Sequence, residues 1–405
     1  MRHQSVCILL SPLAWTFVPS CASAQEATQV TTVSLTSALR AESNVAKANP
    51  DRALQRGLQQ ADQRLTVGAE LSLIRPLGRN SLELTAFAGY DFYNRNARLN
   101  RERIALDADA GLYFGNCQLQ LNPRFERRQS DLAQLAVLNV PGIDSVRNTQ
   151  TVQNYESSLQ CGRANGLKIL GSAGYTQGNN SNSLRRFANY RGHQLQAGVS
   201  YQNPVLGEFT ATLGRDRITY PERSGTIGLS GYRIDQLKIT GRREIGAILT
   251  ANASLAYSNL DPDGPAGGGF KGLTWTAGLS AVPSTDLRVT LDFARSLNPS
   301  LGGEALYSRD TSYALAAEYA LTPRTSVFSG VTRNDRRFAN ARSTQTVLLT
   351  NDRLDQLNAG LRMQVNRRLK LSLEGGHERR NANGTFLDYR NTYGLLTASI
   401  TLGNF

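Results

Sequence analysis

Apolar and polar residues alternate with a period of two along almost the whole chain. In residues 65–73 every second residue is apolar, and small or polar residues lie between. The alternation is sharpest in the C-terminal third, where residues 287–293 place leucine, valine and phenylalanine opposite Arg288, Thr290 and Asp292. A period of two predicts β-strands with one apolar and one polar face, and about eighteen such segments fill the chain.

The polar faces of these segments carry full charges. Asp107 and Asp109 lie between Leu106, Ala108 and Ala110 on one predicted strand. A periplasmic β-sandwich could show the same alternation, but it would have to bury such carboxylates in its core at a high cost. A wide barrel keeps them in an aqueous lumen. After the N-terminal region no apolar stretch approaches the about 18 residues of a transmembrane helix, so only strands could cross a membrane.

The connections between the predicted strands alternate in length. One set is short, as at residues 115–116 and 284–286, and the other is longer and polar, as at residues 136–148, 179–188 and 298–309. Short periplasmic turns and long external loops are typical of outer-membrane barrels. Aromatic residues near the strand ends of the apolar faces resemble interface girdles: Tyr90, Phe92, Tyr175, Tyr201, Tyr257, Tyr313 and Tyr319.

These patterns predict an all-β fold, a transmembrane antiparallel up-and-down β-barrel of the Gram-negative outer membrane. Residues 58–405 form the barrel in this interpretation. Residues 25–57 are the least regular, and could be a first strand, a periplasmic tail or a plug of the lumen. The strand number is about eighteen, or about sixteen if this segment adds none.

The N-terminus predicts export through the general secretory pathway. Arg2 and His3 precede an apolar run at residues 7–18, and Ala22-Ser23-Ala24 follows as a small-residue cleavage site. Residues 1–24 therefore resemble a signal peptide that is removed before Gln25. The run is too short to span a hydrocarbon core of roughly 30 Å as a helix.

Two cysteines remain after this cleavage, Cys117 and Cys161. In the predicted topology they lie at the periplasmic end of neighbouring antiparallel strands and on the same outer face. These are the conditions for a cross-strand disulfide. The chain ends at Phe405, and a terminal aromatic residue resembles the signal by which the barrel-assembly machinery recognises its substrates. Phe405 is out of phase with Leu402 and Ile400, in contrast to the usual pattern.

The formal net charge is +13, and arginine supplies most of it, because only five of the 45 cationic residues are lysines. A positive field attracts anions such as phosphorylated lipid headgroups or acidic polysaccharides, and export makes nucleic acid an improbable partner. Arginine doublets concentrate toward the predicted external ends of strands, at residues 127–128, 185–186, 242–243, 336–337 and 379–380. Arginine binds phosphate and carboxylate well, so lipopolysaccharide contact and guidance of an acidic glycan both fit.

Charged residues on the inward faces are the candidate lumen site. Opposed rings of charge set selectivity in pores, but lumen charges could also simply pair across strands. The candidates are Asp107, Asp109, Arg124, Glu126, Arg128, Lys168, Lys238, Arg242, Arg288, Asp292, Arg362 and Lys370. Only His193 and His377 remain in the mature chain, and neither lies beside a nucleophile or a second histidine. We therefore expect no enzyme, no metal site and no cofactor.

Residues 125–132, with the sequence Phe-Glu-Arg-Arg-Gln-Ser-Asp-Leu, follow the first periplasmic cysteine. Together with the cysteine pair and hairpins rich in tyrosine and arginine, they make the chain resemble the β-barrel porin 2 family, which is associated with exopolysaccharide production and export. The resemblance implies a non-enzymatic outer-membrane barrel, a conduit or accessory for polysaccharide that works with polysaccharide-export components.

The leading functional prediction is passage of polar or anionic solutes, including an acidic exopolysaccharide, through a polar, arginine-rich lumen, since a barrel of this size leaves an aqueous channel. The alternative is a structural or adhesive barrel whose loops plug the lumen. In both cases the immediate partners are outer-membrane lipid, lipopolysaccharide and the barrel-assembly machinery.

Overall fold

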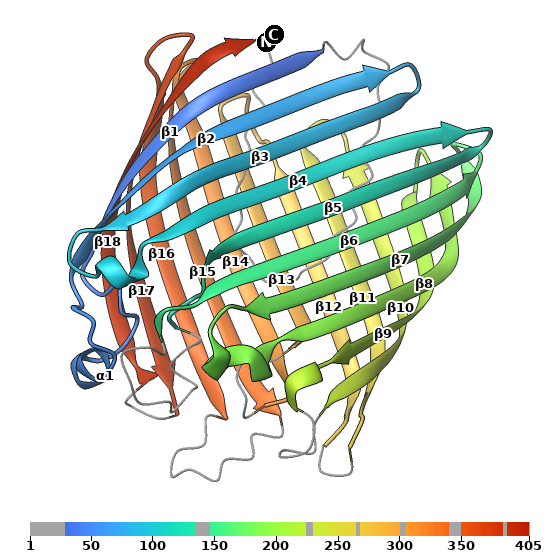
Figure 1. Ribbon diagram of the computed structural model, residues 1–405. Coiled ribbons are helices and arrows are strands. Elements are labelled where there is room, and N and C mark those ends of the chain that lie inside the picture. The colour runs from blue at the N-terminus through green and yellow to red at the C-terminus, as the bar shows by residue number, and fades with distance from the viewer. Residues whose placement is uncertain are drawn as a thin grey trace.

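The computed structural model describes residues 29–133, 146–223, 230–264, 268–299, 305–339, 350–383 and 387–404. Eighteen antiparallel strands form one sheet that closes on itself (Figure 1). The strands are β1(Val30–Glu42), β2(Asp62–Leu77), β3(Asn80–Tyr93), β4(Arg101–Phe114), β5(Cys117–Gln129), β6(Thr149–Gly162), β7(Gly166–Asn180), β8(Tyr190–Asn203), β9(Gly207–Thr219), β10(Gly231–Ile245), β11(Leu249–Pro262), β12(Phe270–Ala281), β13(Leu287–Pro299), β14(Tyr307–Thr322), β15(Thr325–Ala339), β16(Asn351–Gln364), β17(Leu369–Ala382) and β18(Tyr389–Asn404). The predicted closed, up-and-down barrel is confirmed.

The first strand closes the barrel. Strand β1 pairs with β2 on one side and with β18 on the other, over almost its entire length. It lies within residues 25–57, whose role the sequence left open, so the wall begins at Val30. The expected signal peptide at residues 1–24 and the expected terminal signal at Phe405 lie outside the described residues and stay predictions.

The alternation of the sequence becomes the two faces of the wall. Leu195 and Leu213 each leave 66% of their surface uncovered by protein, as expected of side chains that point outward from a barrel. Tyr257 and Tyr319 are exposed on the same face, toward opposite ends of their strands. The outer face is therefore an apolar band, and the residues between these positions point into the lumen. No helix among the described residues is long and apolar enough to cross a membrane.

One end of the barrel carries short turns and the other carries long connections. Gly115 and Gly246 adopt positive φ values of 57° and 61° in two of the short turns, a conformation that glycine adopts without steric cost. Strand β1 begins and β18 ends at this same end, which corresponds to the predicted periplasmic side. The doublet at residues 242–243 also lies there, so its predicted external position is wrong: β10 runs toward the short turn.

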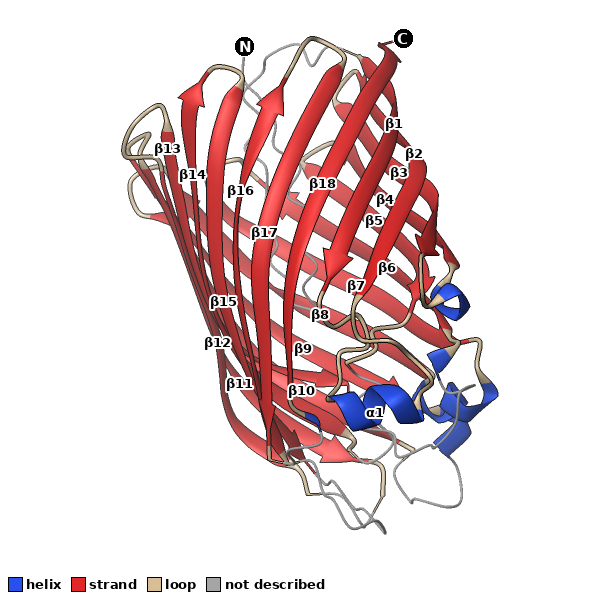
Figure 2. Ribbon diagram, turned by 90° about the vertical axis from the view of Figure 1, so that its left-hand side faces the viewer, coloured by secondary structure: helices blue, strands red, loops and turns tan. Residues whose placement is uncertain are grey.

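The long connections contain all the helical segments described, α1(Pro50–Gln55) and the short 3-10 turns η1(Ala97–Leu99), η4(Ser183–Ala188) and η5(Pro221–Arg223). Figure 2 shows them gathered at the end opposite the short turns. Helix α1 begins after Asn49, whose side chain accepts a hydrogen bond of 2.9 Å from the backbone N–H of Arg52.

The two remaining cysteines form a disulfide. Cys117 and Cys161 lie directly opposite one another on β5 and β6, with Cα atoms 4.0 Å apart and an S–S bond of 2.08 Å. They share the outer face with Leu159 at the periplasmic end. The strand topology predicted this pairing correctly, because the register fixed both the end and the face.

Candidate functional site: the lumen and its loop cap

All twelve charged residues expected in the lumen occupy inward positions of the wall. Lys168 lies between Leu167 and Ile169, which are 64% and 67% exposed on the outer face. Lys238 likewise lies between Leu237 and Ile239, which are 49% and 57% exposed. The same alternation places Asp107, Asp109, Arg124, Glu126, Arg128, Arg242, Arg288, Asp292, Arg362 and Lys370 inward.

Carboxylates bind four of the eight inward cations. Arg124 binds Asp107 on the neighbouring strand at 3.0 Å, and Arg128 binds Glu126 on its own strand at 2.7 Å. Arg242 binds Glu244 at 3.2 Å. These pairs keep both signs of charge in the lumen wall, so part of its positive charge is compensated.

Amides extend this polar surface. Asp109 accepts hydrogen bonds from the side chains of Gln120 at 2.9 Å and Asn122 at 2.6 Å. Lys168 donates to Gln202 at 2.6 Å. The lumen wall therefore presents fixed donors and acceptors that suit polar solutes.

Glu318 holds a separate group of lumen charges. It accepts hydrogen bonds from Arg362 at 3.2 Å and from the hydroxyl of Ser326 at 2.8 Å, and it stands directly opposite Arg288 on β13. The guanidinium of Arg362 also stacks 4.1 Å from the ring centre of Phe328. Phe328 points inward on β15. The sequence signal for it was an apolar residue at a position of the alternation that is otherwise polar or small.

A hollow of about 200 Å³ opens into the lumen beside strands β6 to β13. Gln194, Gln196, Gln236 and Lys238 line it together with Asp216. Asp216 accepts a hydrogen bond of 3.3 Å from Gln236 through one oxygen, while the other oxygen is buried and has no partner among the described residues. Asp216 was not among the predicted lumen residues. Its place between Arg215 and Arg217 on an alternating strand could have indicated an inward carboxylate.

The wall departs from a simple cylinder beside this hollow. Strands β12 and β13 pair only from Trp275 with Arg295 to Ala281 with Val289, so the external ends of the two strands separate. Beyond this point Leu297, on the outer side by alternation, packs against a buried cluster that includes inward side chains of β8, β10 and β11. The external end of the β13–β14 hairpin therefore bends into the mouth. The cluster contains Tyr190, Tyr220, Tyr232, Ile234, Leu260, Leu306 and Tyr307.

The loop after β5 also enters the mouth. The side chain of Arg380, at an inward position of β17, donates a hydrogen bond of 2.6 Å to the carbonyl of Ala133. Arg56, in the β1–β2 connection, donates to the carbonyls of Ala46 at 3.2 Å and Leu132 at 3.3 Å. Because β5 and β17 are not neighbours in the wall, residues 130–133 must reach across the opening.

The loops from the two sides of the mouth are joined. Arg185 donates to the hydroxyl of Ser130 at 3.3 Å, and Arg223 donates to the carbonyls of Phe187 at 2.8 Å and Ala305 at 3.1 Å. Phe187 packs against a second apolar cluster built on Val45, Leu58, Leu99 and Leu132. We call these joined segments the loop cap: residues 43–61, 130–133, 183–188, 220–223 and 305–306.

Arginines are buried in the loop cap at an electrostatic cost. Burial, followed by the nearby charges of Arg52, Arg185 and Arg380, lowers the pKa of Arg56 to about 9. Burial lowers the pKa of Arg185 to about 10, and the charge of Asp131 opposes that shift. Because guanidinium groups keep their proton in proteins, the lowered pKa values mean that the cap holds charged arginines whose burial is not fully compensated.

One carboxylate holds two of the inward arginines at the mouth. Asp352 has a fully buried side chain and lies 2.5 Å from both Arg336 and Arg380. In each of the doublets at residues 336–337 and 379–380, one arginine points inward and the other points outward. The two arginines of a doublet therefore do not form one binding site. No pattern in the sequence predicts the cap, because its contacts join residues far apart in the chain.

The two histidines of the described barrel have separate partners. His377 forms a hydrogen bond of 3.0 Å with Thr392, and the ring of His193 lies 5.1 Å from that of Tyr175. Both occupy outward positions of the wall. Among the described residues, no group of three or more histidine, cysteine, aspartate or glutamate side chains could hold a metal ion.

Comparison with known proteins adds a family similarity. A family model described as Gram-negative porin matches residues 142–339. The match is to porins. Together with the closed barrel and its apolar outer face, it supports a porin-like barrel of the outer membrane. The resemblance to the β-barrel porin 2 family stays a prediction. No curated protein sequence matches the chain.

Solved structures of similar outline include Pseudomonas aeruginosa OccK2 (OpdF), with a TM-score of 0.48 and 12% identity over 92% of this chain and 98% of that one. Acinetobacter baumannii OccAB3 has a TM-score of 0.47 and 11% identity over 93% and 99% of the two chains. A BenF-like porin from Pseudomonas fluorescens Pf-5 has a TM-score of 0.46 and 12% identity over 92% and 99%.

Proposed function

We propose that the protein is an outer-membrane channel for small polar solutes, and that the loop cap makes it prefer anions. The observation that carries this proposal is a closed barrel whose lumen is lined by charges, amides and hydroxyls, with buried arginines at its narrowed mouth. A barrel of eighteen strands is wide enough for an aqueous lumen. The similarity to a Gram-negative porin model supports the same conclusion.

The preference for anions is expected from the cap rather than from the lumen wall. Four of the eight candidate cations of the wall bind a carboxylate, whereas Arg56 and Arg185 donate to carbonyl and hydroxyl oxygens. Within the part of the chain that the structure describes, one buried nitrogen of each has no hydrogen-bond partner, Nη2 of Arg56 and Nε of Arg185. A carboxylate or phosphate that reaches the mouth would be attracted by the positive charge of these buried arginines.

Planar-bilayer recording tests the proposal directly. The purified, folded protein should give stepwise conductance in KCl, with a reversal potential in a salt gradient that shows preference for chloride. Replacing both Arg56 and Arg185 with glutamine should reduce that preference. Arg353→Gln is the matched control, because Arg353 is exposed on the outer face and should leave selectivity unchanged. Folded protein without conductance would instead favour the structural barrel plugged by its loops.

Export of an acidic exopolysaccharide is a finer proposal that rests on the family resemblance. The joined loops across the mouth favour small solutes over a polymer, so liposome flux assays should compare a small organic anion with an acidic oligosaccharide series. Uptake that falls steeply with chain length would contradict the polysaccharide proposal, and uptake independent of length would support it. We also propose that removing Phe405 impairs membrane assembly, which heat-modifiable gel mobility would report.

A further inference from the structure

Arginines line the external rim of the outer face, just beyond the apolar band. On β17 and β18 the outward positions change from Leu373 and Leu396, 59% and 49% exposed, to Arg379 and Arg390. These two arginines stand directly opposite one another across the strand pair. Like charges in that position destabilise a sheet unless something compensates them.

No carboxylate within the described part of the chain compensates this pair. Arg379 donates to the amide oxygen of Asn381 at 3.0 Å. The carboxylate that stands opposite Arg379 on the next strand, Asp355, already binds Arg333 at 2.6 Å. No ion pair among the described residues involves Arg379 or Arg390, so the pair carries two positive charges that face outward.

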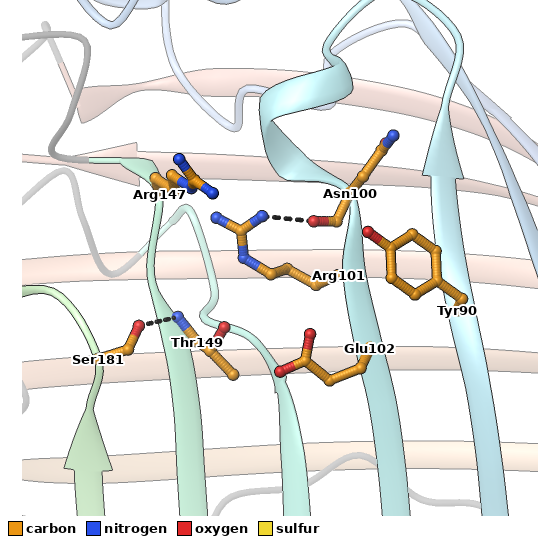
Figure 3. Close-up of a pocket in the computed structure, with 7 residues that line it drawn as sticks. All are labelled: Tyr90, Asn100, Arg101, Glu102, Arg147, Thr149 and Ser181. Carbon is orange, nitrogen blue, oxygen red and sulfur yellow. Dashed lines mark hydrogen bonds between the residues drawn. The ribbon is translucent and has the colours of Figure 1, made fainter.

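A notch in the rim brings two further arginines together. It lies on the other side of β1 from strands β17 and β18. Strand β5 ends at Gln129, and the chain then turns into the mouth, where Ser130 is buried. The start of β4 and the segment before β6 therefore flank a gap with a volume of about 470 Å³. Figure 3 shows the guanidinium groups of Arg101 and Arg147 turned toward one another in this gap.

The chemistry of the notch fits a phosphate. Tyr90, Thr149 and Ser181 also line the gap and supply hydroxyl groups near the two guanidinium groups. The one carboxylate of the lining, Glu102, already binds Arg127 at 2.8 Å. Two converging guanidinium groups and several hydroxyls form a site for a tetrahedral oxyanion, to which arginine can donate two hydrogen bonds at once.

The surface below each arginine pair is apolar and exposed. Ile104 and Leu106 lie on the outer face below the notch, each 37% exposed, and Leu373 and Leu396 lie below the second pair. A ligand that satisfies both regions has a phosphorylated head and several acyl chains. We propose that the notch and the Arg379–Arg390 pair bind the phosphate groups of lipid A, the membrane anchor of lipopolysaccharide.

The test uses the full-length mature protein in an uncharged detergent, with bisphosphorylated lipid A and its dephosphorylated form as probes. Native mass spectrometry should detect binding of the bisphosphorylated form, weaker by about tenfold in Kd when Arg101 and Arg147 are both replaced with glutamine. The double variant Arg379→Gln/Arg390→Gln should show a similar loss. Arg243→Gln is the control, since Arg243 is exposed on the outer face at the periplasmic end.

The outcomes separate the proposal from its rivals. Equal binding of both lipid A forms, or an equal loss in the control, would overturn it. Inorganic phosphate that competes at the same concentration as lipid A would show a solute site instead, and equally tight phosphatidylglycerol would show a general affinity for anionic lipid. A variant Arg147→Gln alone guards against misfolding, because Arg147 is exposed and lies outside the strands. Its binding should weaken while its heat-modifiable mobility stays that of the parent.

Discussion

The inner and outer faces of the barrel wall both carry aspartate–arginine ion pairs, but in different surroundings. On β16, Asp352 points inward with a fully buried side chain and holds Arg336 and Arg380. Three residues further, Asp355 points outward, keeps 33% of its side chain exposed and holds Arg333. The inner pair fixes charge that is buried away from water, whereas the outer pair competes with water and headgroups. The contrast teaches that burial, more than pair geometry, decides what each charge contributes.

The largest expected effect breaks the inner side of this comparison. Asp352→Asn removes the carboxylate between two inward arginines and leaves both uncompensated, which should lower the free energy of unfolding by about 3–5 kcal/mol. Asp355→Asn, on the same strand, should change it by about 1 kcal/mol or less. Denaturant unfolding followed by intrinsic fluorescence in detergent measures both variants. Equal losses for the two variants would contradict the assignment of Asp352 to a buried site.

The disulfide sharpens the comparison along the outer face, from its external to its periplasmic end. Arginines occupy the external rim, while Cys117 and Cys161 link β5 and β6 at the other end across a sequence separation of 44 residues. Replacing both cysteines with serine should cost about 2–4 kcal/mol by releasing that loop in the unfolded chain. Thermal unfolding should show the loss only under oxidising conditions, and a parent protein insensitive to reductant would contradict it.

The sequence was sufficient for the wall because the wall repeats one local rule. Alternation in residues 65–73 or 287–293 fixes face and strand together, and it placed Lys168 and Lys238 in the lumen and the cysteines on one outer face. Strand β1 was harder, because Ser37 interrupts the apolar row between Leu35 and Leu39 and Ala38 interrupts the polar row, which reduces the contrast in polarity. Pairing with both β2 and β18 decides its place.

The loop cap could not be predicted in the same way. Arg380 meets Ala133 across 247 positions of sequence, and Arg223 meets Ala305 across 82. Such contacts depend on how long connections fold over a mouth whose shape exists only after closure. The face that carries the positive charge was hard to predict for a related reason. Composition reports an excess of arginine, but the face that carries it depends on one residue of register at each strand end.

The smallest expected effect concerns selectivity within the lumen. Glu318 is the carboxylate beside Arg362 and opposite Arg288, so Glu318→Gln should leave two lumen cations without compensation. The anion-to-cation permeability ratio should rise, but only about twofold or less at 0.1 M salt, where charges are screened beyond about 10 Å. Reversal potentials in a KCl gradient measure the change, and it should grow at 0.01 M, where the screening length is about 30 Å.

The matched control for that change lies on the other face of the wall. Asp335 binds Arg353 at 2.7 Å on the outer surface, so Asp335→Asn also frees one arginine, but outside the permeation path. Its reversal potential should equal that of the parent at both salt concentrations, because the wall and the headgroup region separate it from the lumen. If Asp335→Asn shifts the reversal potential as far as Glu318→Gln does, the selectivity arises from the field of the whole rim. The lumen charges would then be structural pairs, and the difference between the two faces would lie in stability alone.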